Sequence, residues 1–287
     1  MGWNEVVVLW CAGWGAVALV GYGRSLAGVT EAQRTVRLTG RIERVREPRH
    51  GGSRVGGISV VVSYRDPASG QQTTVTNDGE RGEVITAAWE GRAIGVNHPR
   101  GRPHAYRFSQ APEEPSRGLA WPGLAVFLVY VGLVVLAALT WGWPWVLIGL
   151  GGPSAAFAAA HLPGAVRARN ARFDELAAMD SVPGRIIAVL KDVSVDQDDG
   201  RTMTTLTPVV SFTTQDGTTV TAHCASGLPD PANAYGRDVT VHHTPADPAD
   251  FTLDRAAERR SAERDVTLHA MVTLVLAAVA AAGAALL

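Results

Sequence analysis

The stretch Leu119-Ala-Trp-Pro-Gly-Leu-Ala-Val-Phe-Leu-Val-Tyr-Val-Gly-Leu-Val-Val-Leu-Ala-Ala-Leu139 contains no Asp, Glu, Lys or Arg. A helix of this length, rising about 1.5 Å per residue, is long enough to cross a hydrocarbon core of about 30 Å. Three further stretches, 6–23, 146–166 and 266–287, are equally uncharged and of similar length. The sequence therefore predicts four transmembrane helices, over residues 1–23, 119–139, 146–166 and 266–287.

Nearly all the charge lies in the two segments between these stretches, 24–118 and 167–265. Both segments alternate short β-branched runs with Gly, Pro and Asp, which is typical of strands joined by tight turns. We therefore expect two small soluble β domains, over residues 35–110 and 181–254. The predicted fold class is membrane α plus β.

The two halves of the chain match each other without a gap over a useful stretch. Residues 91–98, Gly-Arg-Ala-Ile-Gly-Val-Asn-His, align with residues 236–243, Gly-Arg-Asp-Val-Thr-Val-His-His. Earlier in each segment, Gly-Arg-Ile at 40–42 matches Gly-Arg-Ile at 184–186. Self-similarity of this kind predicts an internal duplication, with each half reading span, β domain, span.

Two spans in each half mean that the second half enters the membrane from the same side as the first. The repeats are then parallel, related by an axis along the membrane normal, with both β domains on one face. The short connection at residues 140–145, Thr-Trp-Gly-Trp-Pro-Trp, predicts a helical hairpin whose tryptophans suit the headgroup region.

Period-two alternation in the second segment predicts five strands, at 184–190, 207–213, 218–223, 239–243 and 251–253. Asp216-Gly217 predicts a type I′ hairpin turn, and Ser69-Gly70 takes its place in the first segment. So few short strands favour a small antiparallel β-barrel or sandwich, closed or half-closed, because closure hides strand edges. Residues 165–179 and 255–265 lack Gly and Pro, so we expect them to extend the spans as helices.

All 26 Lys and Arg residues lie on the same side of the predicted spans as the β domains. Cationic residues near span ends favour the cytoplasm. The sequence therefore predicts a multi-pass cell-membrane protein with cytoplasmic β domains. A cleaved signal peptide is the alternative for the first span, but residues 1–5 carry an acid and no base, which favours a retained anchor.

The formal net charge of −1 argues against nucleic acid as a partner, because phosphate-binding domains carry a basic excess. The two cysteines fall in different environments, Cys11 inside the first predicted span and Cys224 in the second β segment. They are not expected to form a disulfide.

The order of motifs from 184 to 253 resembles a known bacterial membrane family. A membrane anchor is followed by Gly-Arg-Ile, then Pro-Val-Val-Ser-Phe at 208–212, Asp216-Gly217, and Pro-Ala-Asp-Pro at 245–248. The family is number thirty-five ninety-two of the domains of unknown function. The resemblance covers the second half best, and the first half enters as a looser tandem copy. It implies a membrane-anchored β domain without assigned chemistry, and it transfers no catalytic residue.

Four side chains suggest a metal site: His223, Cys224, His242 and His243. Zinc requires such ligands, but neighbours along a strand point to opposite faces, so neither adjacent pair can easily share one ion. We therefore favour a structural role and predict no metal and no cofactor.

Asp196, Asp198 and Asp199 before Gly200 resemble the start of a calcium loop. An EF-hand needs Gly at its sixth position and Glu at its twelfth, whereas here these positions hold other residues, with Gly200 fifth and Thr207 twelfth. A solvated hairpin tip is the better interpretation.

Arginine follows glycine at equivalent points of both halves, at Arg41 and Arg185 and again at Arg92 and Arg237. The pairs suggest an anion or partner surface. The alternative is that each stem covers apolar surface while its head stays in water. No nucleophile, phosphate loop or paired-cysteine motif accompanies them, so we predict no catalytic residue and no enzyme.

The predicted spans lack any carboxylate or base of the kind that transport chemistry keeps inside a membrane. His161 and His269 lie near span ends. Small residues at Gly152, Ala156 and Ala160, and the Ala-rich stretch 277–285, predict close helix packing. The favoured function is a binding or scaffold protein that presents the β domains to a membrane or cytoplasmic protein partner at the bilayer. The alternative is a component or regulator of a transport or channel complex.

Overall fold

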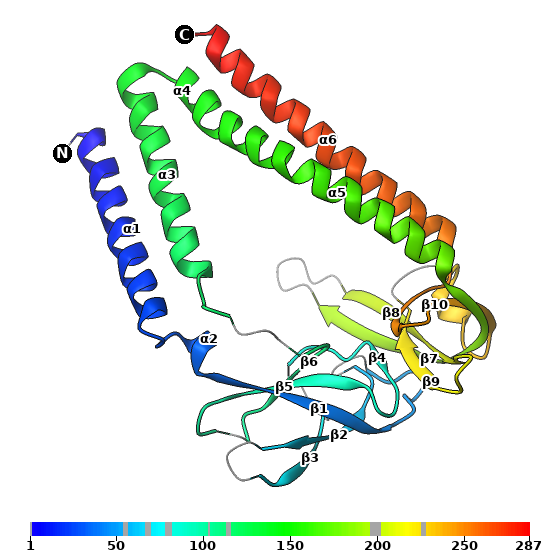
Figure 1. Ribbon diagram of the computed structural model, residues 1–287. Coiled ribbons are helices and arrows are strands. Elements are labelled where there is room, and N and C mark those ends of the chain that lie inside the picture. The colour runs from blue at the N-terminus through cyan, green and yellow to red at the C-terminus, as the bar shows by residue number, and fades with distance from the viewer. Residues whose placement is uncertain are drawn as a thin grey trace. The chain divides into compact units, whose positions relative to one another are not determined.

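The computed structural model describes residues 2–53, 57–66, 70–77, 82–102, 104–112, 116–195, 202–224 and 228–287. The chain divides into two compact units (Figure 1). The helical unit comprises Met1–Arg34, Ser116–Asp174 and Arg259–Leu287, and the β unit comprises Thr35–Pro115 and Glu175–Glu258. Each unit is described by itself.

The long helices are α1 (Trp3–Leu26), α3 (Ala120–Trp141), α5 (Gly152–Ala178) and α6 (Arg255–Ala285). Three short elements accompany them, namely α2 (Glu31–Arg34), α4 (Pro144–Val146) and a π-helical turn, η1 (Leu147–Gly151). By length and composition, four helical stretches are able to cross a membrane: Trp3–Arg34, Ala120–Trp141, Pro144–Ala178 and Arg255–Ala285.

Large apolar side chains cover the outside of these helices. Leu19 is 77% exposed and Leu274 is 70% exposed, and many other Leu, Val and Trp side chains of the helices are exposed as well. Contiguous apolar surface on this scale is costly in water and marks a contact with lipid or protein. The helical unit therefore has the surface of a membrane domain.

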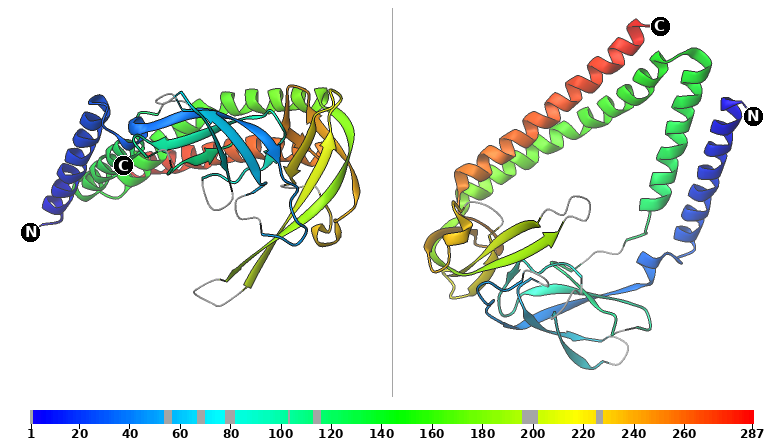
Figure 2. Two further views of the ribbon diagram at one scale, coloured as in Figure 1. Left: turned by 90° about the horizontal axis from the view of Figure 1, so that it is seen from below. Right: turned by 180° about the vertical axis from the view of Figure 1, so that it is seen from behind.

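Helix α1 packs against α3, and α6 lies alongside α5 and the turn η1 that precedes it (Figures 1 and 2). In the first pair Gly21 faces Pro122, and Gly132 lies against Cys11; a Cβ added at either glycine would come within 2.5 Å of the neighbouring side chain. Trp10 Nε1 also donates to the Leu128 carbonyl at 3.3 Å. Glycine thus permits the close approach that helices in a membrane use.

Between η1 and α6 the close contacts are made by Gly151 and Gly283. A Cβ on Gly283 would lie 2.7 Å from Leu147 Cβ, and one on Gly151 would lie 3.1 Å from Ala280 N. Gly152 has open space instead, and Ala156 and Ala160 are exposed, so the predicted contact face was wrong. Alanines cover most of this helix, and small-residue spacing alone could not select the face.

Helix α5 continues to Ala178 and α6 begins at Arg255, which confirms the predicted helical extensions of the spans. Asp254 caps α6, accepting a hydrogen bond from the Ala257 amide at 2.9 Å. The turn between the second and third spans is also confirmed, because α3 ends at Trp141 and α4 begins at Pro144.

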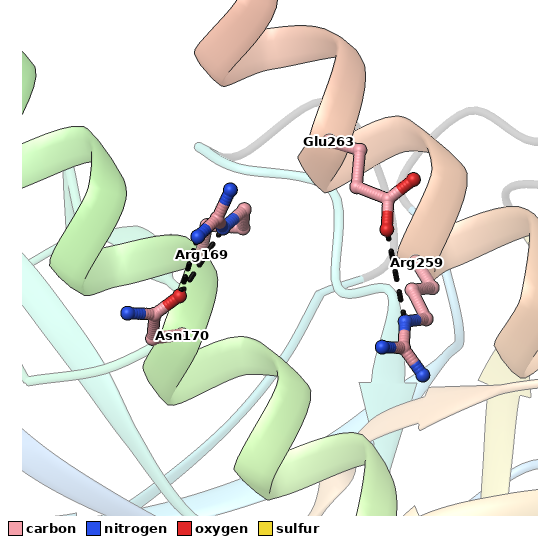
Figure 3. A network of polar contacts seen from close by, with 4 residues as sticks. All are labelled: Arg169, Asn170, Arg259 and Glu263. Carbon is pink, nitrogen blue, oxygen red and sulfur yellow. Dashed lines mark hydrogen bonds and ion pairs between the residues drawn. The ribbon is translucent and has the colours of Figure 1, made fainter.

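Cationic side chains join α5 to α6 beyond their apolar parts. Arg259 of α6 lies over the Phe173 ring of α5 at 4.6 Å, and Arg169 lies 5.7 Å from the same ring. Figure 3 shows the polar contacts of these arginines: Arg169 donates to Asn170 Oδ1, and Arg259 pairs with Glu263 at 3.8 Å. Of these contacts, that between Arg259 and Phe173 joins the two helices, because Arg169 and Asn170 lie on α5 with Phe173 and Glu263 lies on α6 with Arg259.

The β unit contains two antiparallel sheets. The first has the strand order β3-β2-β1-β5-β6 and the second β11-β10-β7-β8-β9-β4. The strands of the first segment are β1 (Thr35–Val45), β2 (Val60–Arg65), β3 (Gln72–Thr76), β4 (Ala87–Ala88), β5 (Ala93–Pro99) and β6 (Arg107–Ser109). Those of the second are β7 (Asp180–Val195), β8 (Thr202–Thr213), β9 (Thr219–His223), β10 (Asp238–Thr244) and β11 (Asp247–Thr252), with a 3₁₀ turn, η2 (Pro231–Asn233), before β10.

The second sheet curves until its edge strand β11 approaches β9, so that it is nearly barrel-shaped. Its core is built from inward-facing residues of every long strand, including Ile186, Val210, Phe212, Val220 and Val241. The first sheet has a separate core. It contains Ile42, Val62, Ile94, Val96 and Phe108.

Strand β4 belongs to the first segment of the chain but completes the second sheet. Ala87 pairs with Ala222 and Ala88 with Thr221 of β9, and the His223 amide donates to the Thr86 carbonyl at 2.7 Å. Ala87 and Trp89 then pack on the core of the second sheet. The first segment of the chain therefore contributes one strand to the second sheet.

Both sheets use the same strand order and the same register. Arg41 lies opposite Ser63 in the first sheet, and Arg185 lies opposite Ser211 in the second. Each central strand carries a bulge just after its Gly-Arg-Ile, between Ile42 and Arg44 and between Ile186 and Ala188. The following backbone hydrogen bonds also coincide, because the Gly91 amide donates to Ile42 and the Gly236 amide to Ile186.

The β8–β9 hairpin differs from its prediction. The Gly217 amide donates to the Thr214 carbonyl at 3.1 Å, and Gly217 has φ +86°. Asp230 is the only non-glycine residue of the described chain with positive φ, so Asp216 has negative φ. The type I′ prediction was therefore wrong. The loop is a type I turn followed by a left-handed glycine, which a three-residue hairpin loop uses. Gly70 also has a positive φ of +70°, whereas Ser69 lies outside the described residues.

Candidate interaction surface

A pocket of about 430 Å³ opens along the seam of the second sheet. Its walls come from β4, β8, β9, β11 and the start of α6, and it is lined by Thr86, Ala87, Thr205, Leu206, Thr207, His223, Cys224, Ala249, Phe251, Thr252, Leu253 and Glu258. Its volume falls within the range of small ligand sites. The lining is mixed, with apolar side chains beside hydroxyls, one imidazole and one carboxylate.

The pocket brings His223 and Cys224 together, and both are buried. Burial raises the pKa of the Cys224 thiol to about 12, with a backbone hydrogen bond acting weakly in the other direction. The thiol therefore stays protonated at neutral pH and is a poor nucleophile. This environment does not favour covalent catalysis by Cys224.

One wall of the pocket is an open strand edge. Strand β9 covers β8 only from Val209 onward, where Val209 lies opposite His223 and the Cys224 amide donates to the Pro208 carbonyl at 2.8 Å. Residues Thr202–Thr207 of β8 have no strand on that side within the described chain. The pocket lies beside the inner end of this edge, at Thr205, Leu206 and Thr207.

The equivalent edge of the first sheet is closed by a side-chain amide. Buried Asn77, which follows β3, accepts a hydrogen bond from the Val60 amide at 2.7 Å and donates to the Ile58 carbonyl at 2.8 Å. The Ile58 amide in turn donates to the Ile85 carbonyl at 2.9 Å. The register places Cys224 at the position of Asn77, so the second sheet has a thiol where the first has an amide.

His242 and His243 point to opposite faces of β10, as the sequence predicted. His243 is buried and stacks on Phe212 at 5.6 Å, whereas His242 contacts Ser181 Oγ at 2.8 Å. Burial lowers the pKa of His242, and the positive charge of Arg255 lowers it further. Within the described residues, no group of three or more His, Cys, Asp and Glu side chains could hold a metal ion.

The paired arginines make different contacts. Arg92 donates to the carbonyls of Ala87 and Gln110 and lies over the Trp89 ring at 4.8 Å. Burial lowers its pKa, and the charge of Asp247 opposes that shift. Arg92 thus links β4 and the following Trp89 to Gln110, which follows β6.

Arg237 donates to the Pro229 carbonyl at 3.3 Å, a single contact beside η2. Arg41 and Arg185 occupy equivalent places beside the left-handed glycines Gly91 and Gly236. Arg41 and Arg185 lie within the central strands β1 and β7, whereas Arg92 and Arg237 directly precede β5 and β10.

The remaining predicted residues lie elsewhere. Asp196, Asp198, Asp199 and Gly200 fall outside the described residues. His161 and His269 are exposed, and the ring of each contacts a carbonyl one turn earlier in its own helix, at 2.9 Å and 2.8 Å. Both contacts are local to one helix.

Sequence reasoning missed three features of the β unit. They are Asn77, strand β4 in the second sheet, and the contacts of residues 50–53 with the second segment. In those contacts His50 stacks on Tyr235 at 4.2 Å, and the Gly51 amide donates to the Val189 carbonyl of β7. One signal was available, because Asn77 directly follows β3 in the first segment as Cys224 directly follows β9 in the second.

Comparison with protein-family models, with curated proteins and with solved structures gives no match. The description of the chain therefore depends on its own fold and side chains.

Proposed function

We propose that this chain is a multi-pass membrane protein in which a β unit, held next to the bilayer by four helices, acts as a binding or scaffold module. The observation that carries the proposal is the combination of four apolar helices with an open strand edge beside a pocket. Edges of this kind bind partner strands through main-chain hydrogen bonds. The module is proposed to work by binding, without catalysis.

The buried groups of the pocket support a binding role. Cys224 is held as a neutral thiol, and the seam is lined with apolar and hydroxyl side chains that suit a peptide surface. Elsewhere in the unit, the described cationic side chains cap strands and cover rings.

An internal duplication is part of this proposal. The shared strand order, the coincident registers and the bulge at the same point of both central strands support it. Membership of the family numbered thirty-five ninety-two among the domains of unknown function remains a proposal as well. It is supported by the motifs of the second half, which fall on β7, β8 and the β10–β11 turn.

We place the β unit in the cytoplasm on the distribution of arginine. The hairpin between α3 and α4 carries no cationic residue, whereas Arg24, Arg117, Arg167 and Arg264 lie near the ends of the apolar stretches on the other side. Protease treatment of sealed vesicles tests this placement. Cleavage of the β unit only from the extracytoplasmic face would reverse it.

Two measurements test the proposed function. Extraction of membranes at alkaline pH should leave the protein in the pellet, because its apolar helices prefer lipid, and release into the supernatant would contradict membrane integration. A photo-crosslinking amino acid at Leu206, on the pocket wall, should then capture a defined protein in native membranes.

The matched crosslinking control carries the same amino acid at Gln215, which is exposed on the β8–β9 loop away from the pocket lining. Capture that is equal at the two positions contradicts a binding role for the pocket edge. Substrate flux through liposomes that contain the purified protein would instead favour a transport or channel component.

A further inference from the structure

The open edge of β8 presents backbone groups that a further strand would satisfy. The Lys191 amide donates to the Gly52 carbonyl at 2.9 Å, so the backbone amide of Lys191 points away from β8. Leu206 lies opposite Lys191 in the register, so the two residues form a non-hydrogen-bonded pair. The backbone amide and carbonyl of Leu206 therefore point away from β7, toward the open edge. By alternation, Thr204 and Thr202 turn their backbone groups outward as well.

The first sheet shows what satisfies such groups. There the equivalent edge is met by the amide of Asn77 and by the peptide carbonyl of Ile85. In the second sheet Cys224 replaces that amide, and a pocket lies beside Leu206. A partner that pairs with the β8 edge would therefore have the chemistry of an extended peptide backbone.

The other edges of the second sheet are protected against strand addition. β11 contains Asp247, Pro248 and Asp250, and charge and proline both discourage a further strand. The outer edge of β9 is covered by β4, and β7 carries Lys191 beside residues 51 and 52. Among the described residues, no strand, charge or proline protects the edge at Thr202–Leu206 in this way.

The sequence of this edge suits pairing with itself. Thr-Met-Thr-Thr-Leu at residues 202–206 has no charge, so two identical strands meet without like-charge repulsion. The side chains of residues 202–205 are exposed, with Met203 65% exposed, whereas Leu206 is half-buried against the core, and Val193 on the paired strand is 56% exposed. Figure 2 shows the end of the β7–β8 ribbon projecting away from the two sheets.

We propose that the partner is a second copy of this chain, whose β8 pairs antiparallel with β8 about a two-fold axis at Thr204, giving a four-stranded sheet β7-β8-β8-β7. The outward-facing residues 202, 204 and 206 are symmetric about Thr204, so Leu206 of one copy lies opposite Thr202 of the other. Each copy then brings its ribbon to the pocket of its neighbour. The inference rests on the proposed membrane function, because two copies in one bilayer hold their β units at the same height.

Disulfide formation tests the axis directly. In this arrangement the two Thr204 Cα atoms are about 5.5 Å apart, within the range that a disulfide spans, so Thr204→Cys in the full chain should give a covalent dimer on mild oxidation of native membranes. Val193→Cys is the matched control. It lies opposite Thr204 on β7 and is similarly exposed, but its two copies would be three strand spacings, roughly 14 Å, apart.

Wild-type protein controls for the native thiols of Cys11 and Cys224. A Thr204→Cys dimer without a Val193→Cys dimer supports the proposal. Equal crosslinking of both variants, or crosslinking of neither, overturns it.

A charge at the axis gives a second, non-covalent test. Thr204→Lys opposes two like charges and should weaken self-association of the detergent-solubilised full chain by about tenfold or more, whereas Val193→Lys should leave it unchanged. Sedimentation measures the monomer–dimer equilibrium. If the wild-type protein is monomeric at every concentration but resists alkaline extraction, the pairing is overturned and the proposed membrane function stands. If alkaline extraction releases the protein, the proposed membrane function is contradicted instead.

Discussion

Removal of the small Asn77 side chain should lower the stability of the β unit by a large amount. Asn77 is 5% exposed, and its amide joins two backbone groups of fully buried residues, the Val60 N–H at 2.7 Å and the Ile58 carbonyl at 2.8 Å. Asn77→Ala leaves both groups buried without these partners. A buried polar group left unsatisfied costs about 1–3 kcal/mol, so the two together should cost about 2–6 kcal/mol.

Hydrogen–deuterium exchange of the full chain in detergent measures this cost locally. Each 1.4 kcal/mol corresponds to about a tenfold faster exchange, so amides of Val60–Arg65 should exchange at least about 25-fold faster in Asn77→Ala. Strand β8 serves as an internal reference, because its edge carries no such amide. Its exchange should change much less.

Asn233→Ala is the matched control, since Asn233 is exposed and its amide reaches only Asp230. Surface substitutions of this kind usually change stability by less than about 0.5 kcal/mol. If Asn77→Ala and Asn233→Ala give the same exchange in β2, the amide does not close that edge, and the contrast between the two sheets loses its basis.

Three further changes test other parts of the account. Burial raises the Cys224 pKa from 9.0 to about 12, so near pH 8 the native thiol should react with an alkylating reagent roughly 1000-fold more slowly than the thiol of the unfolded chain. The contribution of this thiol to the free energy of unfolding should be complete below pH 9 and decline as pH rises toward 12. Cys224→Ala should remove that pH dependence in unfolding measurements. Gly283→Val should drive a side chain into Leu147 and destabilise the packing of α6 on η1 by about 1–3 kcal/mol in thermal unfolding, whereas Gly164→Val, with open space around it, should not. Phe173→Ala should lose its contacts with Arg169 and Arg259, which contribute about 0.5–1 kcal/mol each at an exposed site. Hydrogen exchange at residues 255–265, the start of α6, should then become faster. Phe157→Ala, whose ring has no arginine partner among the described contacts, should leave that exchange unchanged.

The apolar helices and most strands could be predicted because their patterns are periodic and long. The uncharged stretches fall inside helices, and the five strands expected in the second segment each overlap an observed one. The ribbon formed by the ends of β7 and β8 was missed, because residues 202–206 lack a clear alternation of polar and apolar side chains.

The failures have local physical causes. Asp216-Gly217 supports a two-residue turn by composition, but the Thr214 carbonyl accepts from Gly217, which lengthens the loop by one residue. Gly152, Ala156 and Ala160 were expected at a helix contact, but alanines make several faces of that helix small, and the contact with Ala280 is made by Gly151.

The candidate surface could be predicted only in part. His223 and Cys224 were singled out as possible ligands, and they do line one pocket, but the pocket owes its shape to where β9 ends and to β4 arriving from the other segment. Ala87-Ala88 is too short to predict as a strand. Its pairing depends on the tertiary structure.

The central claim is that four helices cross the bilayer and leave both sheets on one side of it. Single cysteines at Gln72 in the first sheet, at Gln215 in the second, and at Trp143 in the hairpin between α3 and α4 report that topology through a membrane-impermeant thiol reagent applied to sealed vesicles of each orientation. The account predicts that the cysteines at 72 and 215 react together in one orientation and the cysteine at 143 in the other. Reaction of 72 and 215 from opposite sides, or of all three from the same side, would contradict it.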